Sequence, residues 1–597
     1  IDYFVSNKMS TWNDTNRFPH NNFIWKGIDG TSVLACVPPT HFITWNMPSQ
    51  IQENWEAYID KDSGGQTMNM FGYGDGGSGC TEEMIELMHR FDKLSIMPKC
   101  EHMGGQEFLE KNLKNNDSLQ TWDGELYLEL HRGTFTTKSN MKRANRRLEY
   151  KLRDAEILSV LRGEDNKKTI TDAYNKLLIN QFHDILPGSH IHPVYEDAMK
   201  DYAEIEKTVD SLIGTGSKYF NTLNFKRDAL TFVPNKKGTA TRYGVKGNWI
   251  IPNIPALSSA SLRATKFNDE WLNCNGNNIE TPFYKAVLND DGSIASLVDK
   301  KQDRQWVDGD FNKLKIYTDC PGNYDAWDIL PNYKDKQIEI NVSEKLSLCE
   351  LDSECATFKT VLSTDKSTWT MLIRFFRRSR GIEVENIVDW NEKHKLAKAE
   401  FSCNVLTRKA LCDTSAGFIE RDTHKNTTWQ QARFETCHHK WADLSETDGG
   451  VALINDGKYG IGFDENTMSL SLLRATIRPD VTSDMGHHNF SYMIYPHENG
   501  AVEAGVNKLA FQFNEQLVKS DVSYNGDTFE PLYLQAMKDS EDGSMTVIRL
   551  SEQDGKRGKI KLSKSVKLLD MLENVIGEAV DTLEYKPFEI ITIGIQK

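Results

Sequence analysis

The sequence predicts an α/β domain, then a three-helix bundle, then β-sandwich domains. Three observations predict this order. Short apolar runs alternate with helical patterns near the N-terminus, apolar residues recur every three or four positions in the middle, and strand patterns fill the rest. We place the three parts at residues 1–135, 136–215 and 216–597.

The first part follows the strand–loop–helix order that is typical of α/β domains. The apolar run at 33–37, ended by two prolines, predicts a buried strand, and the run at 68–73 predicts a second one. A glycine-rich stretch, 72–79, ends that second strand. Thr81 is a suitable N-cap, so a helix is expected to begin after it. Its predicted apolar face consists of Ile85, Met88, Phe91 and Leu94.

Residues 138–213 carry apolar side chains at steps of three and four, which predicts helices with one buried face. After a first helix, a second is expected at about 171–184, ending before Pro187, and a third from about 194. The second helix carries Tyr174, Leu177 and Leu178 on its predicted apolar face. Short links between three amphipathic helices favour a small bundle.

From residue 218 onward the pattern changes to strands. Asp290-Asp-Gly292 lies between two apolar runs and predicts a hairpin, and Arg380-Gly381 lies between two further strand patterns. The C-terminal run 588–595 predicts another strand. Because this long region lacks helical periodicity, we expect one or more β-sandwiches in it.

The chain is acidic. It has 71 Lys and Arg against 86 Asp and Glu, a net charge of −15, with no basic block, which excludes duplex nucleic acid and anionic membranes as expected partners. No apolar run reaches the length of about 18 residues that a membrane-spanning helix needs. Ten scattered cysteines without a C-x-x-C pair predict reduced thiols and a cytoplasmic location. Neutral polyols such as sugars remain as candidate ligands.

Asp75 is the first candidate site residue. It lies in the glycine-rich stretch between a predicted strand and a helix, where α/β active sites are built, and the glycines would let a ligand approach it closely. The stretch lacks the lysine of a phosphate-binding loop. The alternative interpretation is structural: an Asp that accepts hydrogen bonds from turn amides.

His183 and Asp184 form the second candidate, near the end of a predicted helix. Neutral imidazole is a common zinc ligand, and an adjacent carboxylate often orients such a site. His190 and His192 form an H-x-H nearby. The alternative is a histidine that caps the helix or lies in the core.

Further candidates are Arg17, His20, Trp25, His131 and Arg132. Glu125 and Glu129 precede His131 in the same stretch. Arginine, imidazole, aromatic and carboxylate side chains mixed in loops are typical of a polyol site, because they combine hydrogen-bonding groups with a stacking surface. Ordinary surfaces use the same residues, and the alternation at 125–130 is equally compatible with a half-exposed strand.

Eight stretches match one known family in order over nearly the whole chain. They are 10–20 (STWNDTNRFPH), 27–30 (GIDG), 72–77 (GYGDGG), 124–133 (GELYLELHRG), 180–188 (NQFHDILPG), 325–328 (DAWD), 440–445 (KWADLS) and 450–456 (GVALIND). Together they resemble the α-mannosidases of glycoside hydrolase family 38, in the cytosolic and bacterial subgroup. The first part of the chain then resembles a remnant of a seven-stranded α/β catalytic domain.

The resemblance implies a retaining exo-α-mannosidase that releases terminal mannose from glycans and uses one zinc ion. In such enzymes one Asp attacks the anomeric carbon, a second carboxyl group protonates the leaving oxygen, and zinc holds the sugar hydroxyls. Position by position, Asp75 matches the acid/base and His183 a zinc ligand. Asp184 and the five candidates of the polyol group lie in or beside matched motifs, which implies contact with the substrate.

The chain also departs from the family. The family's nucleophile and the H-x-D zinc motif lie upstream of the stretch that matches Ile1, so we expect an N-terminally truncated chain that binds zinc poorly and hydrolyses no mannoside alone. His190 replaces a usual Ser, and Cys80 a usual Pro.

The expected partner is a mannose-containing oligosaccharide. A homo-oligomeric state remains possible. Two other functions also remain open: a non-catalytic carbohydrate-binding or scaffold protein, and a family relative that acts on another α-glycoside.

Overall fold

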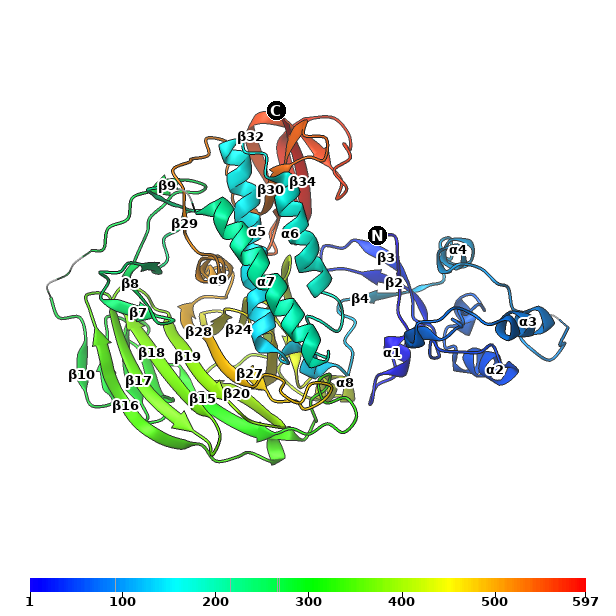
Figure 1. The fold of residues 1–597 in the computed structure, drawn as a ribbon, viewed down its shortest axis with the longest axis horizontal. Helices are drawn as coiled ribbons and strands as arrows, with labels where there is room; N and C mark the ends of the chain where they lie inside the picture. Colours follow the sequence, from blue (N-terminus) through cyan, green and yellow to red (C-terminus); the bar gives the residue numbers. More distant parts are fainter. Residues whose placement is uncertain (92, 215, 266, 268) are drawn as a thin grey trace. The chain divides into compact units, whose positions relative to one another are not determined.

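The computed structural model describes residues 1–91, 93–214, 216–265, 267 and 269–597 (Figure 1). These residues form two compact units. Unit 1 contains 1–131 together with the short segment 426–433, and unit 2 contains 132–425 and 434–597. Segment 426–433 includes the helix α8 (Thr428–Ala432), so unit 1 is completed by residues that lie about 300 positions further along the chain.

Unit 1 is built around a mixed sheet in the order β1-β3-β2-β4. β3 pairs in parallel with β1 and antiparallel with β2, and β4 lies parallel to β2. The predicted strand at 33–37 is confirmed by β3. The strands are β1 (Tyr3–Val5), β2 (Asn22–Lys26), β3 (Ser32–Cys36) and β4 (Gln120–Asp123).

The helices of unit 1 are short, and α3 follows the predicted cap. Thr81 Oγ1 accepts a hydrogen bond from the Met84 amide at 3.3 Å, which is the N-cap contact expected from the sequence. Phe91 is buried and Met88 half-buried, as predicted, but Ile85 and Leu94 are each 42% exposed, and the buried Met84 was not predicted. The helices are α1 (Lys8–Thr11), α2 (Pro48–Ala57), α3 (Glu82–Phe91) and α4 (Gly105–Phe108).

Two strand interpretations in unit 1 were wrong. Residues 68–73 form no strand; their only ladder contact among the described residues is an isolated bridge from Gly72 to Thr44. Residues 125–130 likewise form no strand. An apolar or alternating run becomes a strand only where a neighbouring strand pairs with its main chain, and local sequence does not contain that information.

Unit 2 begins with three helices that pack on one another: α5 (Ser139–Arg162), α6 (Lys167–Asn180) and α7 (His192–Ile213) (Figure 1). α6 ends four residues earlier than predicted, so His183 lies beyond the helix. Leu177 is buried, but Leu178 is 58% exposed, against the prediction. The helices share one apolar core with the C-terminal strands, through residues such as Leu152, Val209 and Ile593.

Several sheets make up the rest of unit 2. The largest has the order β16 (Asn341–Leu351), β17 (Cys355–Ser363), β18 (Thr368–Phe376), β19 (Ile382–Trp390), β28 (Gly486–Glu498), β25 (Gly449–Asn455), β24 (Trp441–Ser445), β21 (Lys409–Thr414) and β22 (Gly417–Asp422). A second has the order β15 (Val307–Thr318), β20 (Lys395–Cys403), β27 (Thr467–Arg474), β26 (Gly460–Asp464) and β23 (Thr436–Cys437). The predicted hairpins on both sides of Asp290–Gly292 and Arg380-Gly381 are confirmed.

Smaller sheets complete the unit. One has the order β10 (Asn273–Asn275), β11 (Asn278–Glu280), β12 (Tyr284–Leu288), β13 (Ile294–Asp299) and β14 (Arg304–Gln305), and the C-terminal one β30 (Tyr533–Asp539), β31 (Met545–Ser551), β34 (Ile590–Gln596), β32 (Gly558–Leu569) and β33 (Val580–Tyr585). Short sheets are formed by β29 (Val518–Lys519), β5 (Tyr219–Phe220) and β9 (Ser259–Ala260), and by β6 (Thr231–Pro234), β8 (Val245–Ile250) and β7 (Ala240–Arg242).

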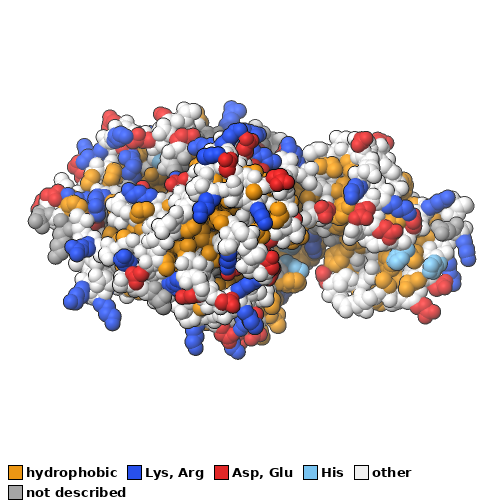
Figure 2. Space-filling view, turned by 90° about the horizontal axis from the view of Figure 1, so that it is seen from above, with side chains coloured by type: hydrophobic (Ala, Val, Ile, Leu, Met, Phe, Trp, Pro, Cys, Tyr) orange, Lys and Arg blue, Asp and Glu red, His pale blue; other side chains and the backbone are white. Residues whose placement is uncertain are grey.

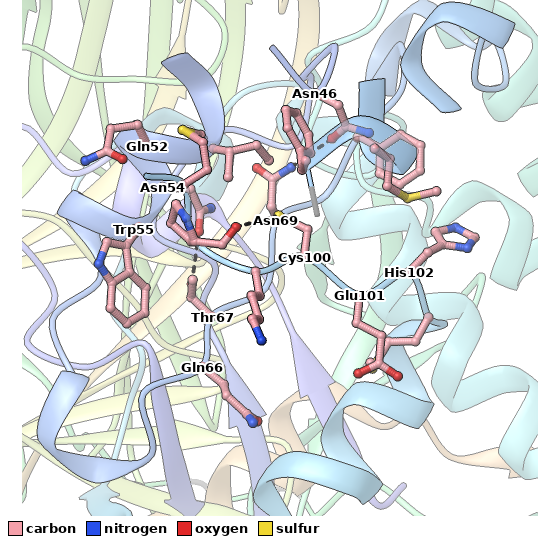
Figure 3. A pocket seen from close by; sticks show the side chains of 18 of the residues that line it. Asn46, Gln52, Asn54, Trp55, Gln66, Thr67, Asn69, Cys100, Glu101 and His102 are labelled. Atoms are coloured by element: carbon pink, nitrogen blue, oxygen red, sulfur yellow. Dashed lines mark hydrogen bonds between the residues drawn. The ribbon is translucent and has the colours of Figure 1, made fainter. Parts of the chain in front are cut away.

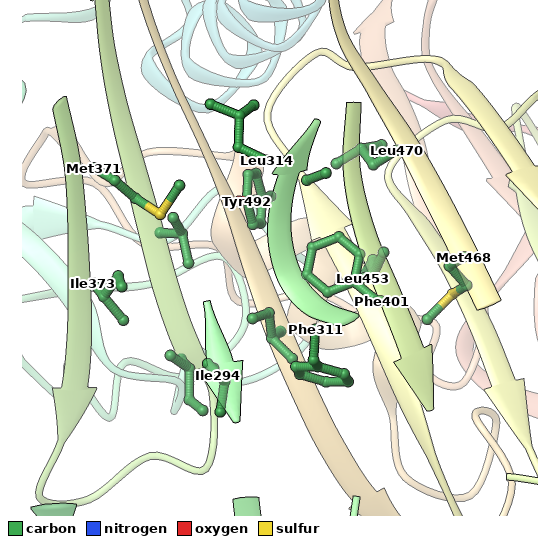
Figure 4. Close-up of a cluster of buried hydrophobic side chains, with 14 of the residues drawn as sticks. Ile294, Phe311, Leu314, Met371, Ile373, Phe401, Leu453, Met468, Leu470 and Tyr492 are labelled. Atoms are coloured by element: carbon green, nitrogen blue, oxygen red, sulfur yellow. The ribbon is translucent and has the colours of Figure 1, made fainter. Parts of the chain in front are cut away.

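A continuous apolar core joins the large sheet to its neighbours. Ile373 and Tyr492 of the large sheet share this core with Ile294 of β13 and with Phe311 and Phe401 of the second sheet (Figure 4). Side chains from facing sheets interdigitate here, which is the packing of a β-sandwich. The prediction of β-sandwiches in the C-terminal part is therefore confirmed.

One helix interrupts the β-rich region. α9 (Val506–Asn514) buries Val506, Ala510 and Phe511 at helical spacing, a pattern that the sequence interpretation missed. Figure 2 shows acidic and basic side chains interspersed over the visible face. In the described part of the chain, no helix combines the length and apolar character needed to cross a membrane.

Candidate functional site

Asp75 lies in a tight, exposed turn of unit 1. The turn is the 3-10 element 74–76, and the side chain of Asp75 is exposed. The amides of Gly76 and Gly77 donate to the carbonyls of Tyr73 and Gly74, at 2.9 and 3.1 Å. Because these amides bond main-chain carbonyls, the alternative role of Asp75 as their acceptor is not observed. The carboxylate is presented to solvent at the tip of a turn.

Gly74 is required by the shape of this turn. Its φ is +51°, and a Cβ there would lie 2.5 Å from the ring of Phe42 and from Ile43. Tyr73 also packs edge-on against Trp45, with ring centroids 6.1 Å apart. Gly74 therefore lets the turn that carries Asp75 lie close against the 42–45 segment.

The other candidates of unit 1 make structural contacts. Arg17 donates to the carbonyl of Ala57, and half-buried His20 lies 3.4 Å from Asp60. Trp25 Nε1 donates to the Gly124 carbonyl at 2.8 Å. The ring of His131 lies 6.2 Å from that of Trp12, and its φ is +74°.

Glu129 lies in the same matched motif as His131 and belongs to the mixed group that the sequence offered as a polyol site, but it was not among the candidate site residues. It is 1% exposed and accepts hydrogen bonds from the amides of Thr15 and Asn16 and from the Asn16 side chain. It therefore anchors the loop that contains Arg17. A buried acceptor that joins positions more than 110 residues apart has no local sequence signature.

Three candidates lie in unit 2. Arg132 is buried; its Nη1 lies 3.4 Å from Asp328 Oδ1, and its guanidinium stacks on Phe434. His183 is exposed just past the end of α6, with its ring 4.0 Å from that of Phe182. Asp184 accepts a hydrogen bond from Ser189 Oγ at 2.7 Å.

The H-x-H pair does not join His183. Buried His190 directs Nδ1 to the Ile191 carbonyl at 2.9 Å, and its pKa is lowered by burial. His192 lies 3.0 Å from Asp480. Within the described residues, no group of three His, Cys, Asp or Glu side chains could hold a metal ion. The residues that the structure describes therefore do not make a complete zinc site.

A polar cavity of about 960 Å³ lies in unit 1 (Figure 3). Its lining contains six amide side chains and ten apolar ones, Trp55 among them, together with Lys99, Glu101 and His102. Asn54 donates to Thr40 Oγ1 and the Met68 carbonyl, and Asn69 Nδ2 donates to Asn46 Oδ1 at 3.2 Å. The buried Asn69 Oδ1 has no hydrogen-bond partner among the described residues. The amides that line the cavity are Asn46, Gln52, Asn54, Gln66, Asn69 and Asn112.

This cavity escaped the sequence interpretation because its amides are scattered from 46 to 112 without a common spacing. Amide groups both donate and accept hydrogen bonds, and an aromatic face can stack on an apolar surface. The volume lies in the range of small-molecule sites. The amide groups of the wall are suited to a hydroxyl-rich ligand.

Comparison with known families covers most of the chain. The models match in order: the glycosyl hydrolases family 38 N-terminal domain over 1–125, the alpha mannosidase middle domain over 129–219, the family 38 C-terminal domain over 279–482 and its C-terminal beta sandwich domain over 531–593. The chain belongs to glycoside hydrolase family 38.

Relatives and solved structures agree with this family. The chain is 30% identical to alpha-mannosidase G of Dictyostelium discoideum and 30% identical to an alpha-mannosidase of Saccharomyces cerevisiae, each match covering 99% of this chain. It spans 63% and 58% of the length of these two proteins. The crystal structure of an alpha-mannosidase from Enterococcus faecalis has the same fold, with a TM-score of 0.76 at 14% identity over 97% of this chain and 82% of that one.

Proposed function

We propose that this family 38 protein is a retaining glycoside hydrolase that removes terminal α-linked mannose from glycans, with Asp75 as general acid/base. One observation carries this proposal: an exposed carboxylate at the tip of a glycine-built turn, inside the unit that matches the family's N-terminal domain. The relatives, which are named as alpha-mannosidases, support α-mannoside as the substrate.

Retention of configuration sets the chemistry expected of Asp75. A carboxyl group first protonates the glycosidic oxygen as the C–O bond breaks, while a second carboxylate about 5–5.5 Å away bonds to the anomeric carbon. The first group then takes a proton from the water that releases the sugar. The exposed turn leaves Asp75 free to meet an oxygen that belongs to a leaving sugar.

The proposal includes a zinc ion, for which His183 would supply one ligand with Asp184 beside it. Zinc would grip hydroxyl groups of the bound sugar. Because the described residues contain no complete set of ligands, we derive no step of the reaction through the metal. We also propose a cytoplasmic location, which the ten free thiols support.

A substrate panel tests the function. The longest form of the protein encoded by its gene would be assayed on linkage-defined mannobioses and on aryl α-mannoside, α-glucoside and α-galactoside. We expect hydrolysis of α-mannosides with the α-anomer of mannose as the first product. Preference for another α-glycoside would favour the family relative with a different specificity, and release of the β-anomer would contradict retention.

The amide-lined cavity favours a second candidate function, carbohydrate binding without catalysis. Replacing Trp55 by Ala is expected to weaken binding of an α-mannooligosaccharide by about tenfold, because stacking surface is lost from the cavity wall. Titration calorimetry on the 597-residue chain measures this.

The matched control is Trp429→Ala, which removes a half-buried indole of unit 1 that does not line the cavity. Its affinity should match that of the wild type. An equal loss of affinity in both variants would contradict the assignment of the cavity as the binding site. Strong binding without hydrolysis by the longest form would favour this second function over the first.

A further inference from the structure

The loop between α6 and α7, residues 181–191, contains His183 and Asp184 and lies against the first half of α5. Three polar side chains of α5 face this loop: Lys142, Asn145 and Glu149. Their spacing of three and four residues places them in one stripe along the helix. The stripe contacts the loop at Gln181, its first residue, and at Leu186 and Pro187 in its second half.

Lys142 holds the second half of the loop. It is 5% exposed, and its ammonium donates hydrogen bonds to the carbonyls of Leu186 and Pro187, at 2.9 and 3.1 Å, and to that of Thr137. An ammonium has three protons, so these three carbonyls satisfy it fully. A buried amine is tolerated when its protons are bonded in this way, and its removal would take this donor from all three carbonyls.

The first half of the loop is held by the other two side chains. Gln181 Nε2 donates to Asn145 Oδ1 at 3.1 Å and to Glu149 Oε1 at 2.9 Å. His183 and Asp184 therefore lie between two anchors on one rigid helix.

Further contacts hold the C-terminal end of the loop in place. Gly188 has a φ of +88°, and a Cβ there would lie 2.6 Å from the Thr137 carbonyl oxygen, so only glycine lets the loop lie this close to the residues just before α5. Beyond it, His192 lies 3.0 Å from Asp480, which also pairs with buried Lys138. Within the loop, the Ser189 amide and hydroxyl both bond to Asp184.

We propose that Lys142 is a positioning residue: with Asn145 and Glu149 it fixes the loop so that the His183–Asp184 pair is presented in one orientation. The link from this orientation to hydrolysis rests on the proposed function. The orientation itself does not.

Lys458 offers a matched control. It is 3% exposed, lies in the same unit, and donates to the Leu472 carbonyl and Ser139 Oγ, but bonds to no residue of the loop. Burial lowers the pKa of both lysines to about 7. Lys142→Met and Lys458→Met therefore remove equivalent buried amines, and a general loss of stability should affect both variants alike.

The test is hydrogen exchange by mass spectrometry on the 597-residue chain. In Lys142→Met, the amides of Ile185, Gly188 and Ser189, which are bonded inside the loop, should exchange about tenfold faster or more. In Lys458→Met they should stay within about twofold of the wild type. Unchanged exchange in Lys142→Met, or the same acceleration in both variants, would overturn the proposal.

A milder variant keeps the test decisive if Lys142→Met does not fold. Gln181→Ala removes the contacts to Asn145 and Glu149 and should accelerate exchange at Ile185 about threefold. No acceleration there would contradict the role of the stripe.

In the longest active form, Lys142→Met should lower kcat on α-mannosides about tenfold or more, with Lys458→Met within about twofold of the wild type. If neither wild type nor variants hydrolyse mannosides, the proposed function fails, while the exchange result still decides the positioning of the loop.

Discussion

Replacing Asp75 by Asn is expected to lower kcat/KM for an unactivated mannobiose by about 10²–10⁴-fold, which is the usual contribution of a general acid. Asn is nearly isosteric with Asp but cannot transfer a proton. The alkoxide of a sugar is a poor leaving group, so departure of the sugar needs that proton. A dinitrophenyl group departs without it, so kcat/KM for the dinitrophenyl mannoside, which reports the first step, should change by less than about tenfold.

The matched control for this variant is Asp62→Asn. Asp62 is an exposed carboxylate in another 3-10 turn of unit 1, so it reports the effect of losing a surface charge. Its activity should equal that of the wild type. Added azide should also accelerate the second step in Asp75→Asn, because azide attacks the sugar–enzyme intermediate without a general base. Equal loss on both substrates would contradict the acid role of Asp75.

Replacing Arg474 by Met is expected to lower the free energy of unfolding of unit 2 by about 3–5 kcal/mol. Arg474 is 1% exposed, and its Nε and Nη2 donate to Asp319 Oδ2 at 3.2 and 2.6 Å. It also bonds to Thr137 Oγ1 and to the Asp328 carbonyl. The variant would leave the buried Asp319 carboxylate without its cation, and that uncompensated charge is the main cost.

Urea unfolding followed by tryptophan fluorescence measures this change. Arg147→Met is the control, since Arg147 pairs with Glu206 at the surface and such a pair contributes at most about 1 kcal/mol. The double variant Arg474→Met, Asp319→Leu should be more stable than Arg474→Met alone, because it removes the stranded charge. A double variant that is less stable by the sum of both single losses would contradict this account.

Local pattern was sufficient for much of the fold. The strand at 33–37, the Thr81 cap, the hairpins around Asp290–Gly292 and Arg380-Gly381, and the β-sandwiches of the C-terminal part follow from apolar period and turn chemistry, which act between near neighbours. The same reasoning failed at 68–73 and at Leu178. Whether an apolar run pairs, or an apolar side chain is covered, depends on what lies opposite to it.

The candidate site divides in the same way. Motifs were enough to single out Asp75 and His183, because catalytic families repeat short stretches of sequence. The amide-lined cavity and the Glu129 contacts with Thr15 and Asn16 were not visible, since their members lie far apart along the chain. No spacing rule connects such positions.

The sequence by itself therefore determined the family, the residues that are candidates for chemistry, and most of the elements that contain them. Only the tertiary structure decided what holds those residues. It showed that Gly74 lets the Asp75 turn lie against Phe42, and that Lys142 bonds to the carbonyls of Leu186 and Pro187 in the loop that contains His183. The physical reason is that each residue's type fixes its side-chain chemistry, whereas its burial and its hydrogen-bond partners arise only when distant segments pack together.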